Sequence, residues 1–230
     1  MKALARPGSQ SVMMKAPVSG IAISLVSDFH RGDAIEDATL EGVLGLAPSN
    51  ETRSGSLPSL LHRFGNQNFG FGRLSFRDLR EIFRAVKPRP TDMFCDAGAG
   101  YGHAVFYGAC VTDCRFRAVE ILPVRCNAMR KTARRLGLKV EIVQGDALAQ
   151  DYADVSHLFV NNPFFPDAAQ KFADRLTIAR ERPLTVIAVH NIVDTFRSDA
   201  AFSEIDVGAD LPNYCFGVFR WNSPRPALRG

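Results

Sequence analysis

The sequence has 230 residues, of which 46% are hydrophobic and 23% are charged. This length and composition suit one α/β domain with a sizeable core, and they exclude a wholly disordered or fibrous chain. The net charge of +4 mildly favours an anionic partner such as a nucleic acid, but it does not select one.

Residues 1–57 are rich in Ser, Gly, Pro and Ala, and we expect them to form an arm or a small N-terminal cap. A short strand at 21–26 is the one regular element suggested there. Neither this segment nor any other contains an apolar run long enough for a secretion signal or a membrane span. We therefore expect a cytoplasmic protein with no membrane partner.

Strands and helices alternate from residue 76 onward. The expected helices cover 76–86, 102–109, 124–136 and 167–180, and the expected strands cover 93–96, 116–120, 140–143, 157–160, 184–189 and 214–221. This alternation predicts a mostly parallel sheet flanked by helices. In such sheets the carboxyl ends of the strands share one edge, where ligands bind.

The five cysteines are an odd number scattered along the chain, which favours reduced, buried thiols over a disulfide framework. Cys110 and Cys114 lie one helical turn apart, but no second pair occurs at zinc-site spacing. We therefore expect no metal.

A glycine-rich turn follows the strand at 93–96. Gly98, Gly100 and Gly102 leave the backbone amides open to a polar ligand at the start of a helix. A dinucleotide loop has the pattern G-x-G-x-x-G, and its third glycine position is His103 here. The spacing therefore disfavours a nicotinamide cofactor.

Acidic residues end three successive expected strands: Asp96, Glu120 and Asp146. A carboxylate at Asp96 suits the amino group of a methionine moiety, and Glu120 suits the two hydroxyls of a ribose. Asp146 is placed to accept from an adenine amino group. One acid at a strand end is commonplace, but three of them with the glycine loop at the first predict S-adenosylmethionine as the cofactor.

These features resemble the class I methyltransferases and, within them, the disruptor-of-telomeric-silencing family of non-SET histone lysine methyltransferases. Residues 71–76 resemble that family's Tyr-Gly-Glu loop followed by Ser-Phe, 94–109 its cofactor loop and helix, and 118–120 its ribose-binding acid. The most specific match is 159–165, Phe-Val-Asn-Asn-Pro-Phe-Phe, which is similar to the family's Phe-Val-Asn-Asn-Phe-Ala-Phe. The resemblance covers residues 65–221.

The resemblance implies a Rossmann-like fold with a mostly parallel seven-stranded sheet, and a methyltransferase domain at 58–230. It also implies a protein lysine side chain as the methyl acceptor. The implied cofactor-binding residues are Asp96, Gly98, Gly100, Gly102, His103, Glu120, Ile121, Asp146, Ala147, Val160 and Asn161. Arg73 and Pro163 depart from the family's pattern.

Four residues are the candidate catalytic group. Asn161 offers an amide at a strand's carboxyl end, where it could orient the cofactor or the nucleophile. Phe71, Phe164 and Phe165 could wall a channel whose apolar lining lowers the pKa of a lysine. Each of these phenylalanines equally suits the hydrophobic core.

Two alternatives to a lysine methyltransferase remain. Residues 162–165 also resemble a degenerate Asn-Pro-Pro-aromatic loop, found in enzymes that methylate the amino group of adenine, cytosine or glutamine, where the planar group stacks on the aromatic side chain. The net charge and Trp221 are compatible with a nucleic-acid partner. The departures at Arg73 and Pro163 suggest a second alternative, an inactive methyltransferase-like binding module. Of the three hypotheses, we favour the lysine methyltransferase.

Overall fold

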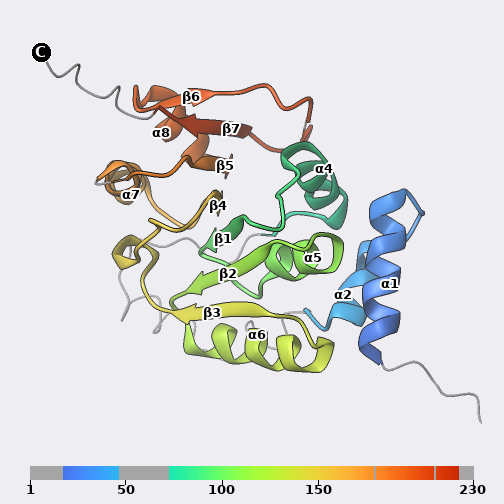
Figure 1. The fold of residues 1–230 in the computed structure, drawn as a ribbon. Helices are drawn as coiled ribbons and strands as arrows, with labels where there is room; N and C mark the ends of the chain where they lie inside the picture. The colour runs from blue at the N-terminus through green and yellow to red at the C-terminus, as the bar shows by residue number, and fades with distance from the viewer. Residues whose placement is uncertain (1–17, 47–72, 179, 210, 223–230) are drawn as a thin grey trace, which may run out of the picture.

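The computed structural model describes residues 18–46, 73–178, 180–209 and 211–222. A seven-stranded sheet forms its centre, in the order β3-β2-β1-β4-β5-β7-β6 (Figure 1). The strands are β1 (Met93–Ala97), β2 (Arg115–Glu120), β3 (Val140–Gln144), β4 (His157–Asn161), β5 (Thr185–Val189), β6 (Phe202–Glu204) and β7 (Phe216–Trp221). The first five strands are parallel, and β7 lies antiparallel between β5 and β6. The expectation of a mostly parallel seven-stranded sheet is confirmed.

Helices cover both faces of the sheet. They are α1 (Val18–Arg31), α2 (Asp37–Leu44), α4 (Phe76–Val86), α5 (His103–Val111), α6 (Pro123–Leu136), α7 (Pro166–Thr177) and α8 (Ile192–Ser198), with a 3₁₀ turn, η1, at Ala147–Ala149. The side chains of α4, α5 and α6 share a core on one face, and those of α7 and α8 share a core on the other. The sequence pattern did not indicate α2, α8, η1 or β6.

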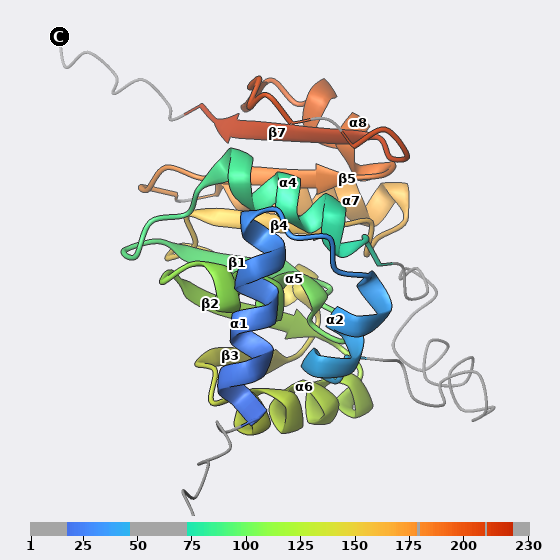
Figure 2. The ribbon, with the colours of Figure 1, turned by 90° about the vertical axis from the view of Figure 1, so that its right-hand side faces the viewer.

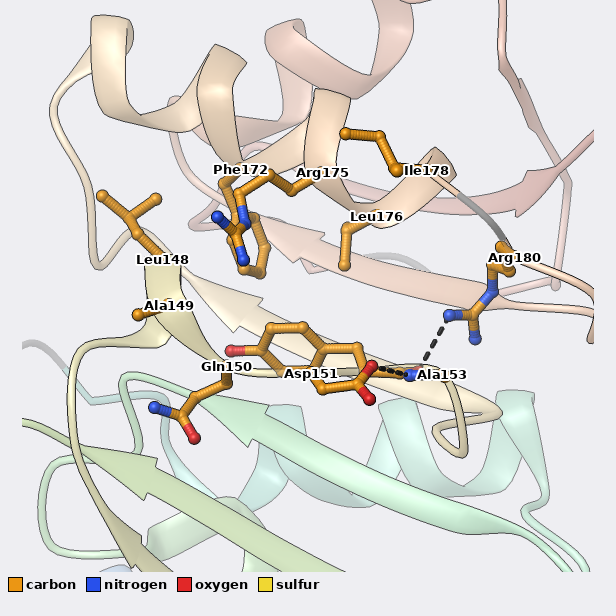
Figure 3. A pocket seen from close by; sticks show the side chains of 11 residues that line it. Leu148, Ala149, Gln150, Asp151, Ala153, Phe172, Arg175, Leu176, Ile178 and Arg180 are labelled. Atoms are coloured by element: carbon orange, nitrogen blue, oxygen red, sulfur yellow. Dashed lines mark hydrogen bonds between the residues drawn. The ribbon is translucent and has the colours of Figure 1, made fainter.

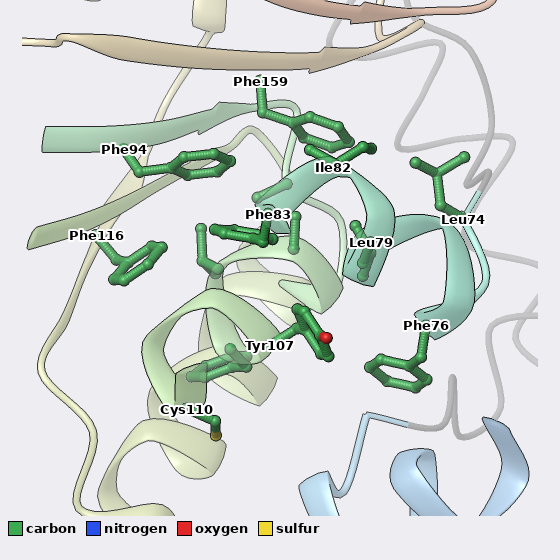
Figure 4. Packing of buried hydrophobic residues seen from close by; sticks show 14 of the residues in the cluster. Leu74, Phe76, Leu79, Ile82, Phe83, Phe94, Tyr107, Cys110, Phe116 and Phe159 are labelled. Atoms are coloured by element: carbon green, nitrogen blue, oxygen red, sulfur yellow. The ribbon is translucent and has the colours of Figure 1, made fainter. Parts of the chain in front are cut away.

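Successive side chains along each strand point to opposite faces of the sheet, so the strands contribute to both cores. Phe94, Phe116 and Phe159 point to the α4–α5 face, where Phe94 stacks on Phe83 of α4 with ring centroids 4.9 Å apart (Figure 4). Their neighbours in β1 and β4, such as Cys95, belong to the core beneath α7 and α8. Asp96 alternates with Cys95, so its side chain belongs to the α4–α5 face.

Part of the N-terminal segment is helical and packed on the domain, with α1 and α2 lying over α5 and α6 (Figure 2). Residues 21–26, expected as a strand, lie inside α1, so that expectation was wrong. Ala22 and Val26 share one face of the helix at i and i+4 spacing and are buried. The ring of His30 makes a 2.8 Å hydrogen bond to the hydroxyl of Tyr107 in α5.

Helix α4 has a well-defined start that matters for the site. Ser75 accepts a hydrogen bond from the Asp78 amide at 3.1 Å, and the Asp78 carboxylate accepts from the Ser75 amide at 3.2 Å. The Asp37 carboxylate of α2 accepts from the Phe76 amide at 2.9 Å. Two carboxylates therefore hold the first turn of α4 beside the end of β1.

No helix among the described ranges is long and apolar enough to cross a membrane.

Candidate functional site

The glycine loop lies between the carboxyl ends of β1 and β4. Gly98 has φ +88°, and a Cβ atom there would lie 2.5 Å from Cβ of Pro163, which follows β4. Gly102 has φ +82°, and a Cβ atom there would lie 2.8 Å from the Phe106 ring. Both positions require glycine for their backbone conformation and for the space around them. The amides of Gly98 and Ala99 both donate to the Val119 carbonyl at 2.9 Å.

Glu120, at the end of β2, is buried and holds the glycine loop from the other side. Its carboxylate accepts from the Gly100 amide and from the Leu122 amide, each at 2.8 Å, and Arg125 lies 3.6 Å away. Burial raises the pKa of Glu120, and Arg125 opposes that rise. A carboxylate has about four acceptor positions, so acceptor capacity remains for hydroxyl donors beside the two amides and Arg125.

Asp96 is the least satisfied acidic group of this region. Its side chain is buried, and it accepts no hydrogen bond from the described residues. Burial, followed by the charge of Glu120, raises its pKa to about 8. An ammonium group bound beside this buried carboxyl group would favour its charged form, because opposite charges attract strongly where water is excluded.

Asp96 lines a cavity of 20 Å³ together with side chains from three other segments. Asn161 enters it from the end of β4, His103 from the start of α5, and Arg73 from the residues before α4. Burial, followed by the charge of Arg73, lowers the pKa of His103 to about 4, so this imidazole is neutral at pH 7. The cavity therefore contains one acid, one fixed cation and polar neutral groups.

The structure brings together Asp96, Gly98, His103 and Asn161, four of the predicted cofactor-binding residues, in this cavity, and it adds Arg73, which was not predicted as a site residue. Arg73 forms an ion pair with Glu41 of α2. It appeared in the sequence only as a departure from the family's loop acid. A cation two residues ahead of the Ser75 capping box was the signal that could have indicated its position near the strand ends.

Asp146 and its neighbours lie at the end of β3, as the sequence predicted. Asp146 is exposed, and its carboxylate accepts from the Leu148 amide at 2.9 Å, capping η1. Ala147 is buried, and Ile121 is half-buried beside Glu120. Val160 is buried inside β4, so its side chain belongs to the core beneath α7 and only its backbone faces the strand edge.

The loop after β4 separates the predicted catalytic residues. Phe164 is buried, with its ring centroid 4.8 Å from that of Phe172 in α7, so it supports the loop from the core. Phe165, at the start of α7, is 39% exposed. Asn162 has φ +48°, and its Oδ1 atom is buried without a hydrogen-bond partner among the described residues. Phe71 lies outside the described residues.

Two aromatic side chains that were not predicted as site residues lie at the same edge. His190 follows β5 with φ +69°. Its ring makes an edge-to-face contact with Tyr214, at 5.1 Å between centroids and 89° between planes. The aromatic run at 214–221 indicates a strand in the sequence, and nothing in that pattern distinguishes Tyr214 as a site residue.

A second cavity, of 390 Å³, lies on the other face between η1 and α7 (Figure 3). It is lined by Tyr152, Phe172 and Arg175 among others. None of the predicted cofactor-binding residues lines it, although Leu148, which does, follows one of them directly in the chain. The buried guanidinium of Arg180 donates to the Tyr152 carbonyl at 2.9 Å. Within the described ranges, no group of three His, Cys, Asp or Glu side chains is placed to hold a metal ion.

Solved structures with the same arrangement of strands and helices place this geometry in a known fold. An RNA methyltransferase from Salinibacter ruber, in complex with S-adenosyl-L-homocysteine, has 21% sequence identity and a TM-score of 0.54 over 69% of this chain and 98% of that one. The chain has the class I methyltransferase fold. TrmN from Thermus thermophilus matches with a TM-score of 0.51 and 17% identity over 65% of this chain and 49% of its own.

SMU.1697c from Streptococcus mutans, also in complex with S-adenosyl-L-homocysteine, matches with a TM-score of 0.50 and 10% identity over 66% of this chain and 100% of its own. No protein-family model and no curated protein matches the sequence. At these identities the comparisons establish the fold. The disruptor-of-telomeric-silencing subfamily is not among the neighbours described.

Proposed function

We propose that this protein is an S-adenosylmethionine-dependent N-methyltransferase whose acceptor is an amino group of a nucleobase in RNA. The observation that carries the cofactor assignment is the buried Asp96 carboxyl group, which has no donor among the described residues and lies beside the glycine loop. A methionine ammonium group provides the missing partner. Arg73, in the same cavity, is complementary to the methionine carboxylate.

The other contacts fit the rest of the cofactor. Glu120 retains acceptor positions for ribose hydroxyls beside the Gly100 amide that it already binds. Asp146 uses one carboxylate oxygen to cap η1, which leaves the other for an adenine amino group. When bound, this cofactor supplies a methyl group activated by an adjacent sulfonium.

The chain's own contribution to the reaction is positioning and exclusion of water. The acceptor nitrogen must lie in line with the methyl–sulfur bond, so that a nitrogen–carbon bond forms as that bond breaks and the electron pair stays on sulfur. The proton of the methylated nitrogen then leaves to water. Asn162 can accept a hydrogen bond from the acceptor's amino group and hold the nitrogen in that orientation.

The loop after β4 supports a planar acceptor rather than a lysine. A lysine channel requires several aromatic walls, but Phe164 lies in the core. Phe165 is the exposed ring at the fourth position of Asn162-Pro163-Phe164-Phe165, where a base could stack on it. One of the structural neighbours reported above supports this direction, since it is named an RNA methyltransferase.

Transfer of a tritiated methyl group from S-adenosylmethionine to RNA, DNA, acid-extracted histones and cell lysate tests this function. We expect label that ribonuclease releases and protease does not. Protease-sensitive label on histone lysines would restore the lysine hypothesis that the 159–165 motif first suggested. Calorimetry with S-adenosylmethionine is the companion measurement, and absence of binding would favour an inactive module.

A further inference from the structure

The carboxyl ends of β4, β5 and the start of β7 meet in register at the acceptor side of the site. Asn161 pairs with Val189, and Val189 pairs with Phe216. The next residues outward are Asn162, His190 and Cys215, and the His190 amide donates to the Cys215 carbonyl at 2.7 Å. Neighbouring strands lie about 4.8 Å apart, so Asn162 and His190 leave the sheet side by side.

Both of these residues have left-handed backbone conformations. Asn162 has φ +48° and His190 has φ +69°, and Lys87, at a helix end, is the third non-glycine residue with positive φ among the described residues. Such conformations cost free energy and recur at functional sites. The two residues that adopt them lie at the ends of adjacent strands.

The polar atoms of this pair are not used by the described part of the protein. Asn162 Oδ1 is buried without a hydrogen-bond partner. Neither the ring nitrogens of His190 nor the hydroxyl of Tyr214 makes a hydrogen bond to a described residue. Burial lowers the pKa of His190, so at neutral pH the imidazole presents one N–H donor and one nitrogen acceptor.

We propose that Asn162 and His190 together recognise the edge of a nucleobase that carries an amino group beside a ring-nitrogen acceptor, as adenine and cytosine do. Asn162 accepts from the amino group, and His190 donates to the ring nitrogen. Tyr214 fixes the imidazole by its edge-to-face contact. A lysine ammonium group offers three donors and no acceptor, and uracil offers no amino group, so neither satisfies both positions.

This inference rests on the proposed function and assigns the base class that it acts on. The first test measures binding of fluorescein-labelled oligoadenylate, oligocytidylate and oligouridylate in the presence of saturating S-adenosyl-L-homocysteine. We expect one of the first two to bind at least tenfold more tightly than oligouridylate. Equal binding of all three would overturn the inference.

The variants are chosen to preserve the backbone. His190→Gly and Asn162→Gly both tolerate positive φ, so they remove the side chain without introducing strain. His190→Asn keeps an N–H donor and also tolerates this conformation. We expect His190→Gly to abolish the preference over oligouridylate and to raise KM for the methylated RNA at least tenfold, and His190→Asn to restore part of both.

The outcomes separate this inference from the function on which it rests. The affinity for S-adenosylmethionine in calorimetry should be the same in the wild type and in all three variants. A wild type that binds no S-adenosylmethionine contradicts the proposed function. A wild type that methylates RNA, with a His190→Gly variant of unchanged KM and unchanged base preference, contradicts this inference alone.

Discussion

Pro163 lies so close to Gly98 that a single added carbon at Gly98 would lie 2.5 Å from the proline Cβ. The cofactor loop after β1 and the acceptor loop after β4 are therefore in direct contact. A side chain at Gly98 would therefore displace the loop after β4.

This contact predicts the effect of Gly98→Ala. The substitution forces Pro163 away and places alanine at φ +88°, so we expect loss of measurable S-adenosylmethionine binding and destabilisation by more than about 1–2 kcal/mol. Gly208→Ala is the matched control, because Gly208 also has a positive φ, +66°, but nothing lies within 4 Å of its Cβ position. The control should lose stability only from strain and should bind the cofactor normally. Calorimetry and thermal unfolding measure both.

Asp96 predicts how cofactor affinity depends on pH. Its pKa is raised to about 8 by burial and by Glu120, and the cation of Arg73 and the imidazole of His103 line the same cavity. Below that pH the free protein holds a proton there, which must leave when a methionine ammonium binds. Affinity should therefore rise with pH from 6 to about 8, approaching about tenfold per unit. It should level off as the cofactor's own amino group loses its proton near 7.7–8.0.

The same carboxyl group affects the stability of the cofactor-free protein in the opposite direction. The pKa of an aspartate in an unfolded chain is about 3.9, and the pKa of Asp96 in the folded protein is about 8. Between these two pH values the folded state therefore binds more protons than the unfolded state. The Asp96 contribution to the free energy of unfolding is present below pH 4 and is lost as pH rises through about 8. Asp96→Asn should flatten both pH profiles. Profiles unchanged by that substitution would contradict the role given to Asp96.

Glu120→Gln tests the ribose contact and the loop contact together. Glutamine keeps one acceptor oxygen, so either the Gly100 amide or the Leu122 amide loses its partner. We expect the affinity for S-adenosylmethionine to fall by about 1–3 kcal/mol in binding free energy. Asp146→Asn is the informative comparison, since Asp146 is exposed and its loss of charge should cost less. Equal losses of S-adenosylmethionine affinity in the two variants, measured by calorimetry, would contradict the larger role given to Glu120.

Asp37 predicts that the N-terminal helices stabilise the start of α4. Asp37→Ala removes the acceptor of the Phe76 amide and should lower the free energy of unfolding by about 1 kcal/mol. Asp33→Ala, which removes a side chain with no hydrogen bond to a described residue, is the control. Urea unfolding followed by the fluorescence of Trp221, the sole tryptophan and a buried one, measures the difference.

Cys215 offers a chemical probe of the acceptor side. It is the exposed cysteine, and the other four are buried. A bulky maleimide should therefore react with one thiol rapidly. Because Cys215 adjoins Tyr214, the adduct should weaken RNA binding while leaving S-adenosylmethionine binding intact. Cys215→Ser should remove the rapid reaction and retain RNA binding.

The sequence was sufficient for those parts of the molecule that depend on local pattern. Strand periodicity located the five parallel strands, and it placed the glycine loop, Asp96 and Glu120 at the carboxyl ends of β1 and β2, since both follow from the chain order of an α/β sheet. Helix α1 was misjudged because the apolar run at 21–26 is short and follows Pro17 and Gly20, as a strand after a turn would. Ala22 and Val26 of this helix are buried, and the helix packs against α5 and α6. Local sequence does not contain those contacts.

The acceptor side required the structure for a different reason. His190 and Tyr214 are 24 residues apart, and they meet because β7 inserts antiparallel beside β5, which brings the start of one strand to the end of the other. Arg73 and Asp96 meet through the packing of α4. Phe164 and Phe165 are adjacent and equally apolar, yet one is in the core and the other is exposed, and only the turn into α7 decides which.

Because β7 inserts antiparallel beside β5, the cofactor side and the acceptor side of the site are built from different parts of the chain. The residues that line the Asp96 cavity come from the ends of β1 and β4 and from the starts of α4 and α5, whereas the acceptor side also requires β7. On the proposed function, substitutions in the segment around Tyr214 should change which molecule receives the methyl group without altering how the methyl group is supplied. New acceptors would then be acquired by divergence of this segment.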